Sequence, residues 1–450
     1  MPRSHYLLLA ALVLLLGSLA QAQAQIVALW PLDSRPVTSA WPGLLGRAAG
    51  MDLRLPPTNW LGTATTGASA DQLEAWLDET KPDLVIVSLD SLAYGGLVQS
   101  RQAGPSLEDA WARLQPLRDW RKRSGVRVWA FVVIPRQPEA RDAPRNLALI
   151  DRALDLAGDG TFERLVVGWD DALGSPAPAQ GAAVRAAAET RGLKNVAVYA
   201  GADEIASTLV ARAALAGARV TPSVALITDD PAAAGRVLPY DGQPLAATFA
   251  AQAGAVGFTA SDDAPDRVTL FVRTSLNARD AALRVLDLQR RGPTALVDLE
   301  KVNTFNWTWL EALRVTGAVP TLAGLAGWGT PGNNVGWALA EAAVSLVAPS
   351  DALAPLLALG YVNDGLYSSV LRPELRAEGW LTSVSDVRTE AGNGELLQRV
   401  QAALPRSGLA AGQDVRVTAA SFPWARTFEV SVTVSVEPPR PGPWQSRLAP

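Results

Sequence analysis

The sequence predicts an α/β fold, a (β/α)8 TIM-like barrel with an αβ insertion near 220–265 and a small C-terminal α+β extension. Short apolar runs alternate with helical segments along most of the chain. Omitting 220–265 leaves eight βα units in about 325 residues, which suits such a barrel. Counting that segment as a ninth strand favours the alternative, an open doubly wound parallel sheet.

The expected strands are apolar runs of about 4–8 residues bounded by Gly, Pro or acidic residues. They lie at 25–30, 84–89, 127–134, 164–168, 195–199, 223–227, 267–272, 294–297 and 321–325. The expected helices have helical periodicity or are rich in Ala. They lie at 72–79, 107–123, 146–156, 180–191, 205–215, 278–290, 307–314 and 335–346. We therefore expect 25–350 to form a barrel-like catalytic domain.

The chain changes character after Asp351. The run from Phe428 to Val436 alternates strictly between apolar and polar residues, as a strand buried on one face does. A second strand is expected at 414–419 and a helix within 386–404. These features predict that 351–437 forms C-terminal helices and a β-hairpin packed on the barrel, followed by a Pro-rich tail at 438–450.

The N-terminus predicts export. Arg3 precedes an apolar run from Leu7 to Leu16, and small residues alternate near Ala22 and Ala24. This pattern is typical of a secretory signal peptide, here residues 1–24. The apolar run is too short for a membrane span. We therefore expect a secreted, periplasmic or cell-envelope protein with no stable membrane span after signal cleavage.

Composition excludes several kinds of chemistry. The only histidine, His5, lies in the predicted signal, and the chain has no cysteine. Ser-His-Asp and Cys-His catalysis, disulfides and the usual zinc sites are therefore excluded from the mature chain. Any chemistry must use carboxylates, Tyr, Arg, hydroxyls, amides, the four lysines or an oxygen-bound metal. The net charge of −4 and the dispersed basic residues do not indicate a nucleic-acid partner.

Several expected strands end in acidic residues. The acids that follow them are Asp33, Asp90, the pair Asp170 and Asp171, and the pair Asp203 and Glu204. Loops after the carboxyl ends of parallel strands gather on one face, so these acids are expected to converge. The alternative is that each Asp caps the helix that follows its strand.

Asp170 and Asp171, after Trp169, form the sharpest motif. Neighbouring carboxylates split their pKa values, which suits glycosidic bond cleavage by an acid and an ionised partner. Asp203 and Glu204 are the second catalytic candidates. The structural alternative for the first pair is one helix cap and one solvated acid. For the second pair it is a cap by Asp203 with Glu204 favoured by the helix macrodipole.

The candidate substrate-binding residues lie in three loops. Asp33 and Arg35 lie in a rigid Pro-bounded loop, and Asp90, Tyr94 and Arg101 flank a Gly-Gly turn. The third loop carries Trp328, Asn333 and Asn334 among small residues. A flat aromatic face beside fixed amides suits sugar rings. A structural ion pair, Asn helix caps and a core Trp are the alternatives.

These stretches together resemble DUF4127, a bacterial family of unknown function. The resemblance rests on 31–36, 88–101, Asp170-Asp171, 201–204, 326–336 and 423–429, which span nearly the whole mature chain in order. Two positions differ from the usual pattern, since Ser34 stands where the family has Asp and Gly329 where it has Asn. The resemblance implies no established activity.

Three functions remain open. The first is a carbohydrate-active hydrolase that uses carboxylates as general acid and base without a cofactor, acting on a small-molecule or glycan substrate. The second is a phosphoesterase or ester hydrolase that holds Mg²⁺ or Ca²⁺ among the same acids. The third is a non-catalytic cell-envelope protein that binds glycans.

Overall fold

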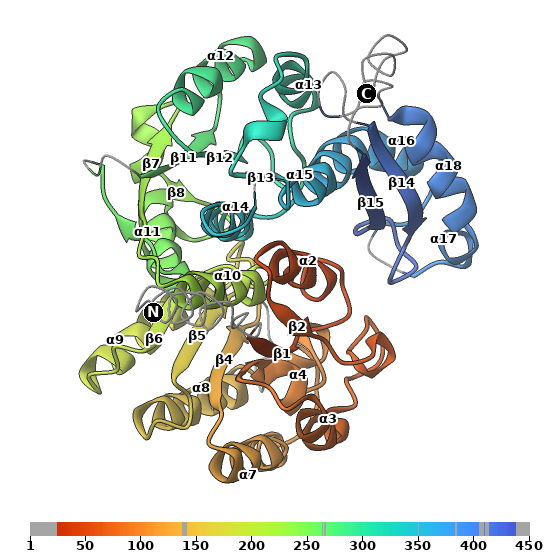
Figure 1. Ribbon diagram of the computed structural model, residues 1–450. Coiled ribbons are helices and arrows are strands. Elements are labelled where there is room, and N and C mark those ends of the chain that lie inside the picture. Colours follow the sequence, from red (N-terminus) through yellow and green to blue (C-terminus); the bar gives the residue numbers. More distant parts are fainter. Residues whose placement is uncertain are drawn as a thin grey trace, which may run out of the picture.

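The protein consists of two open parallel sheets and the helices that cover them (Figure 1). The computed structural model describes residues 25–136, 142–262, 264, 267–349, 351–382, 385–404, 409 and 414–437. The predicted signal segment 1–24 and the Pro-rich tail 438–450 lie outside the described residues.

The first sheet is built from the N-terminal half of the chain. Its strands are β1 (Ile26–Trp30), β2 (Asp52–Arg54), β3 (Leu84–Ser88), β4 (Arg127–Ile134), β5 (Arg164–Trp169) and β6 (Val196–Ala200). They pair in parallel in the order β2-β1-β3-β4-β5-β6. In β1, Val27 and Leu29 pack in one core and Ala28 and Trp30 in another. The strands are apolar throughout because both faces of the sheet are covered.

Helices cover the outer face of the first sheet and share its core. They are α3 (Leu73–Thr80), α4 (Leu89–Ala93), α6 (Leu107–Ala112), α7 (Gln115–Ser124), α8 (Asp142–Gly158) and α9 (Ala177–Thr190). The single helix expected at 107–123 is divided into α6 and α7. The expected loop at 91–101 contains the end of α4 and the short α5 (Leu97–Ser100).

The second sheet follows along the chain. It contains β7 (Ser223–Thr228), β10 (Thr259–Ala260), β11 (Val268–Arg273), β12 (Thr294–Asp298) and β13 (Gly324–Ala326) in the order β10-β7-β11-β12-β13. The segment 220–265, which we expected to be an insertion, supplies β7 and β10. It also holds the small pair β8 (Val237–Leu238) and β9 (Gln243–Pro244), and α11 (Leu245–Val256).

The outer face of the second sheet packs against α12 (Ala278–Gln289), α13 (Trp307–Val315), α15 (Ala354–Gly360) and the π-helical segment η5 (Tyr361–Leu371). Short 3₁₀ turns complete the connections of the two sheets. They are η1 (Thr58–Trp60), η2 (Ala70–Gln72), η3 (Pro231–Gly235) and η4 (Val319–Thr321).

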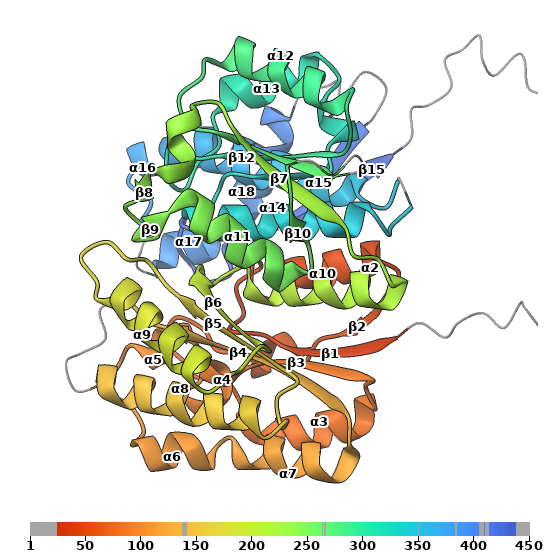
Figure 2. The ribbon, with the colours of Figure 1, turned by 90° about the vertical axis from the view of Figure 1, so that its left-hand side faces the viewer.

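One layer of helices lies between the two sheets and packs on both (Figure 2). It contains α2 (Ala40–Ala48), α10 (Ile205–Ala218), α11 and α14 (Pro331–Ser345). Most of α10 and almost all of α14 are buried, as expected for helices that are mainly apolar around their circumference. The chain is therefore layered as helix, sheet, helix, sheet, helix.

The described strands do not close into a barrel. The first sheet ends at β2 and β6, the second at β10 and β13, and no pairing joins them. The physical reason is the shared middle layer, because α10 must bury both of its sides whereas a barrel helix keeps one side in water. The open doubly wound arrangement, our alternative, fits both sheets.

The C-terminal region contains α16 (Arg372–Ala377), α17 (Val387–Ala391), α18 (Asn393–Ala403) and an antiparallel hairpin of β14 (Asp414–Ser421) and β15 (Ser431–Glu437). The hairpin packs on α18 and α15. Among the described residues, no helix is both long enough and apolar enough to cross a membrane.

Candidate functional site

A polar cavity of about 380 Å³ lies where loops of both sheets meet. Its walls come from the carboxyl ends of β1, β3, β4, β5, β6, β12 and β13 and from the C-terminal region. The lining residues are Arg35, Leu97, Val98, Arg101, Arg136, Asp170, Asp171, Asp203, Tyr240, Asn303, Trp328, Gly329, Thr330, Asn333, Trp424, Arg426 and Phe428. The location is where open α/β sheets bind ligands, and the volume suits a small molecule.

The first charged group joins the loops after β1 and β6. The Arg35 guanidinium donates to Asp33 at 2.8 Å and to both oxygens of Asp203, at 2.7 and 3.1 Å. Burial lowers the pKa of Arg35, but Asp203 and Asp33 together raise it well above its ordinary value. Burial raises the pKa of Asp203 against the opposing effect of Arg35. Arg35 is therefore a fixed cation that bridges two acids.

The second charged group joins the loops after β3, β4 and β5. Arg101 pairs with Asp170, and Arg136 pairs with Asp171 at 2.9 Å. Burial raises the pKa of Asp170, but Arg101 and Arg136 outweigh burial and hold it below its ordinary value. Asp171 also accepts the backbone N–H of Leu173 at 2.8 Å. Asp170 is thus ionised, and both acids have cationic partners.

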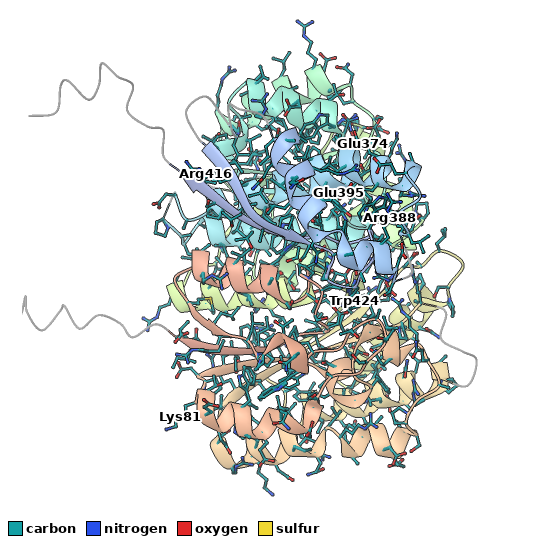
Figure 3. The ribbon with its side chains drawn as sticks, turned by 90° about the vertical axis from the view of Figure 1, so that its right-hand side faces the viewer. Lys81, Glu374, Arg388, Glu395, Arg416 and Trp424 are labelled. Atoms are coloured by element: carbon teal, nitrogen blue, oxygen red, sulfur yellow. The ribbon has the colours of Figure 1, made fainter. Side chains whose placement is uncertain are left out.

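The C-terminal region forms one wall of the cavity. Figure 3 places Trp424 where this region meets the N-terminal part of the protein. The Trp424 indole N–H donates to Ser34 Oγ at 2.9 Å. The guanidinium carbons of Arg35 and Arg426 lie over the Trp424 ring, 5.3 and 4.8 Å from its centroid. Arg426 also pairs with the buried Glu429 at 2.9 Å. These contacts fix the wall against the loop after β1.

The loop after β13 forms a neighbouring part of the wall. Trp328 packs against Trp41 and Phe428, and its backbone N–H donates to Asp364 at 3.2 Å. Asn333 Oδ1 accepts the N–H groups of Ala202 and Asp203, at 2.9 and 3.3 Å. The first turn of α14 is therefore tied to the loop after β6, with Asn333 held in one orientation.

The structure brings seven of the twelve predicted site residues to the cavity wall. They are Arg35, Arg101, Asp170, Asp171, Asp203, Trp328 and Asn333. The other five, Asp33, Asp90, Tyr94, Glu204 and Asn334, are buried behind it.

These five side chains support the loops. Asp90 accepts the N–H of Val133 at 2.8 Å, and burial raises its pKa to about 7. Tyr94 packs under Arg145. Asn334 holds Gly329 through two hydrogen bonds. Glu204 accepts from Gln252 at 3.1 Å, and burial raises its pKa well above the ordinary value.

Sequence reasoning missed several lining residues. Arg136 also follows a predicted strand, but it lies beside no acidic residue or Gly-Gly turn and was not selected. Tyr240 lies in the segment that we interpreted as an insertion. Trp424, Arg426 and Phe428 belong to a motif quoted for the family resemblance, and that motif was the one available signal for them.

The acids of the cavity are poorly arranged for a metal ion. Within the described ranges, no group of three or more carboxylates is placed to hold one. Asp33, Asp170, Asp171 and Asp203 each pair with an arginine, so a cation would meet guanidinium groups as well as oxygen donors.

Fold and site together define an α/β protein of two parallel sheets with a polar, aromatic-walled cavity at their carboxyl edges. The family described as "Protein of unknown function (DUF4127)" matches residues 27–146 and 140–433. The chain therefore belongs to the DUF4127 family, as the sequence motifs predicted. No curated protein matches the chain.

Solved structures give only remote likenesses. A mutant of the XylFII-LytSN complex matches with 11% identity, covering 72% of this chain and 92% of that one at a TM-score of 0.20. Tryptophan synthase subunit alpha from Legionella pneumophila str. Paris has 10% identity, coverage of 72% and 93%, and a TM-score of 0.22. A C2-type ketoreductase has 17% identity, coverage of 70% and 75%, and a TM-score of 0.21. At these TM-scores the likenesses support no conclusion.

Proposed function

We propose that the cavity binds a carbohydrate, a ligand with many hydroxyl groups and no net charge. The observation that carries this proposal is the pairing of Arg with Asp along the wall. A hydroxyl group both donates and accepts hydrogen bonds, so it is served by a guanidinium beside a carboxylate. A negatively charged ligand would be repelled by the carboxylates, and a positively charged ligand would be repelled by the guanidinium groups.

The aromatic residues support the same ligand class. A sugar ring has apolar C–H faces that pack on flat aromatic rings. Trp424 is occupied by Arg35 and Arg426. Trp328 is buried against Trp41 and Phe428, whereas Tyr240 is half-buried and lines the cavity. We expect the sugar to pack on Tyr240 while its hydroxyls reach the Arg–Asp pairs.

Hydrolysis of a glycosidic bond is the second candidate, and one observation favours it. Burial raises the pKa of Asp203, whereas Arg101 and Arg136 outweigh burial at Asp170 and lower its pKa. Two carboxyl groups with pKa values moved apart are what an acid and an ionised partner require. Against it, Asp203 is bonded through both oxygens to Arg35, which favours its ionised form.

Titration calorimetry with a panel of neutral mono- and disaccharides tests binding, and aryl glycosides of the same sugars test hydrolysis. We expect at least one sugar to bind to wild type and binding to be lost in Arg101→Met, which removes the partner of Asp170. Turnover that disappears in Asp203→Asn, while the sugar still binds, would establish the hydrolase. Failure of every sugar to bind to folded protein would refute the proposal.

Mg²⁺ and Ca²⁺ test the remaining alternative. The Arg–Asp pairing predicts that neither ion binds in the cavity and that a chelator leaves sugar binding unchanged. Tight calorimetric binding of either ion, lost in Asp170→Asn, would favour the metal-dependent hydrolase instead. We also propose export, which N-terminal sequencing of protein recovered from the cell envelope or medium would test by finding cleavage near residue 24.

A further inference from the structure

A small apolar niche adjoins the main cavity. Its size, about 10 Å³, is enough for one water molecule or one methyl group. It shares Asp203, Trp328, Gly329 and Asn333 with the main cavity and adds Val37, Trp41, Glu204, Asn334, Trp337 and Asp364. The surface that it exposes is almost wholly apolar. Bound water needs two or more polar partners, so an apolar group suits this niche better.

Asn333 presents a hydrogen-bond donor at the entrance to the niche. Its Oδ1 accepts the N–H groups of Ala202 and Asp203, so the amide is held with Nδ2 directed away from them. Within the described part of the chain, Nδ2 makes no hydrogen bond, and it is not among the buried polar atoms. A fixed amide N–H pair is therefore available to a ligand carbonyl oxygen.

Several polar groups at the niche have partners, whereas Trp328 Nε1 and Glu204 Oε2 are buried without one among the described residues. Asn334 makes two hydrogen bonds to Gly329, and Asp364 accepts the N–H groups of Gly327 and Trp328. Burial raises the pKa of Glu204 well above its ordinary value, which favours the uncharged form of this carboxyl. The Asp203 carboxylate at the niche is paired with the Arg35 guanidinium.

We propose that the cavity selects sugars that carry an N-acetyl group. The acetyl carbonyl oxygen accepts from Asn333 Nδ2, and its methyl group enters the niche between Trp41, Trp328 and Trp337. This inference rests on the proposed carbohydrate function and narrows it to one substituent. A donor next to a methyl-sized apolar space matches the two ends of an acetyl group, and a hydroxyl group has no methyl to fill that space.

Matched sugar pairs test the inference by titration calorimetry of the full chain. Glucose, galactose and mannose are each compared with the corresponding 2-acetamido sugar. In at least one pair the acetylated sugar should bind about tenfold more tightly or better, the effect of filling a small apolar pocket. The N-propionyl analogue of that sugar should bind more weakly than the N-acetyl form, because its extra methylene exceeds the niche.

Three variants locate the effect. Asn333→Asp keeps an acceptor for Ala202 and Asp203 but loses the donor, and Val37→Leu fills the niche. Both should reduce the ratio of acetylated to unacetylated affinity toward one. Val220→Leu, the same change at an exposed position outside the cavity and the niche, should leave the ratio unaltered. The ratio is informative even if a variant is less stable, because both sugars meet the same protein.

The outcomes separate the two proposals. If sugars bind but no acetylated member is favoured, or if the preference survives both Asn333→Asp and Val37→Leu, the niche holds water only. The acetyl inference is then overturned and carbohydrate binding stands. If no sugar of either kind binds, the proposed function and the inference both fail.

Discussion

Replacing Arg35 with Met should strongly destabilise the protein. The Arg35 side chain is 7% exposed, and the side chains of Asp33 and Asp203 are 1% and 12% exposed. Removing the guanidinium leaves two buried carboxylates without their cation. Removing one partner of a buried ion pair costs about 3–5 kcal/mol of unfolding free energy. Met keeps most of the volume of the side chain, so a cavity adds little to this cost.

Urea denaturation at pH 7 measures the change as a lower midpoint at constant slope. Arg54→Met is the matched control, because Arg54 and Asp52 form an exposed pair, and it should leave the midpoint unchanged. Adding Asp203→Asn to Arg35→Met should recover part of the loss by removing one unpaired charge. An Arg35→Met midpoint no lower than that of Arg54→Met would refute the argument.

The pH dependence of the Arg35→Met variant gives a second check. Burial already raises the pKa of Asp203 against the effect of Arg35, so without Arg35 its folded-state pKa should lie further above the unfolded value of about 3.9. A carboxyl group with a raised folded pKa favours folding at low pH and loses that contribution as pH rises. The deficit relative to wild type should therefore be largest at neutral pH and smaller near pH 4.

Three further predictions concern the loops that carry the cavity. Burial raises the pKa of Asp90 to about 7. Between pH 4 and 7 the free energy of unfolding of the wild type should therefore fall by about 2–4 kcal/mol relative to that of Asp90→Asn, and above pH 7 it should fall no further. Denaturation across this pH range measures the difference. Equal pH profiles for the two proteins would contradict this. Trp424→Phe and Ser34→Ala each remove one hydrogen bond and should each cost about 1 kcal/mol. The double variant should cost little more than either single change, and simple additivity would show that the bond contributes nothing. Gly332→Ala places a Cβ 2.5 Å from the carbonyl oxygen of Ala200 and should lower the thermal midpoint through a loss of about 1–3 kcal/mol. Gly254 lies in α11 with open space around it, so Gly254→Ala should raise the free energy of unfolding by about 0.5–1 kcal/mol. An equal change in stability at both glycines would exclude the steric explanation.

Local patterns predicted the strands well and their assembly poorly. The runs that became β1, β3, β4 and β5 are apolar, β-rich and bounded by turn residues, so their conformation follows from nearby sequence. Strand pairing depends on distant contacts, and eight βα units are compatible with a barrel or with open sheets. The available signal was that α10 and α14 are mainly apolar around their circumference, which requires a covering layer on both sides.

The candidate site was also predicted in part, from local patterns but not from distant contacts. Acids at strand ends predicted that Asp170, Asp171 and Asp203 would converge, because parallel strands place their exit loops together. Their arginine partners were not predicted as pairs, since Arg35 and Asp203 are 168 residues apart in sequence. Adjacent residues also diverged, with Asp203 at the cavity and Glu204 beneath it, because side-chain direction depends on the turn between them.

The most direct measurement is a crystal structure with the tightest-binding sugar of the panel. We expect the ring in the cavity between the sheets, packed on Tyr240, with hydroxyl groups bonded to the Arg101–Asp170 and Arg35–Asp203 pairs. A sugar bound elsewhere, with this cavity holding only solvent, would contradict carbohydrate binding at the Arg–Asp pairs.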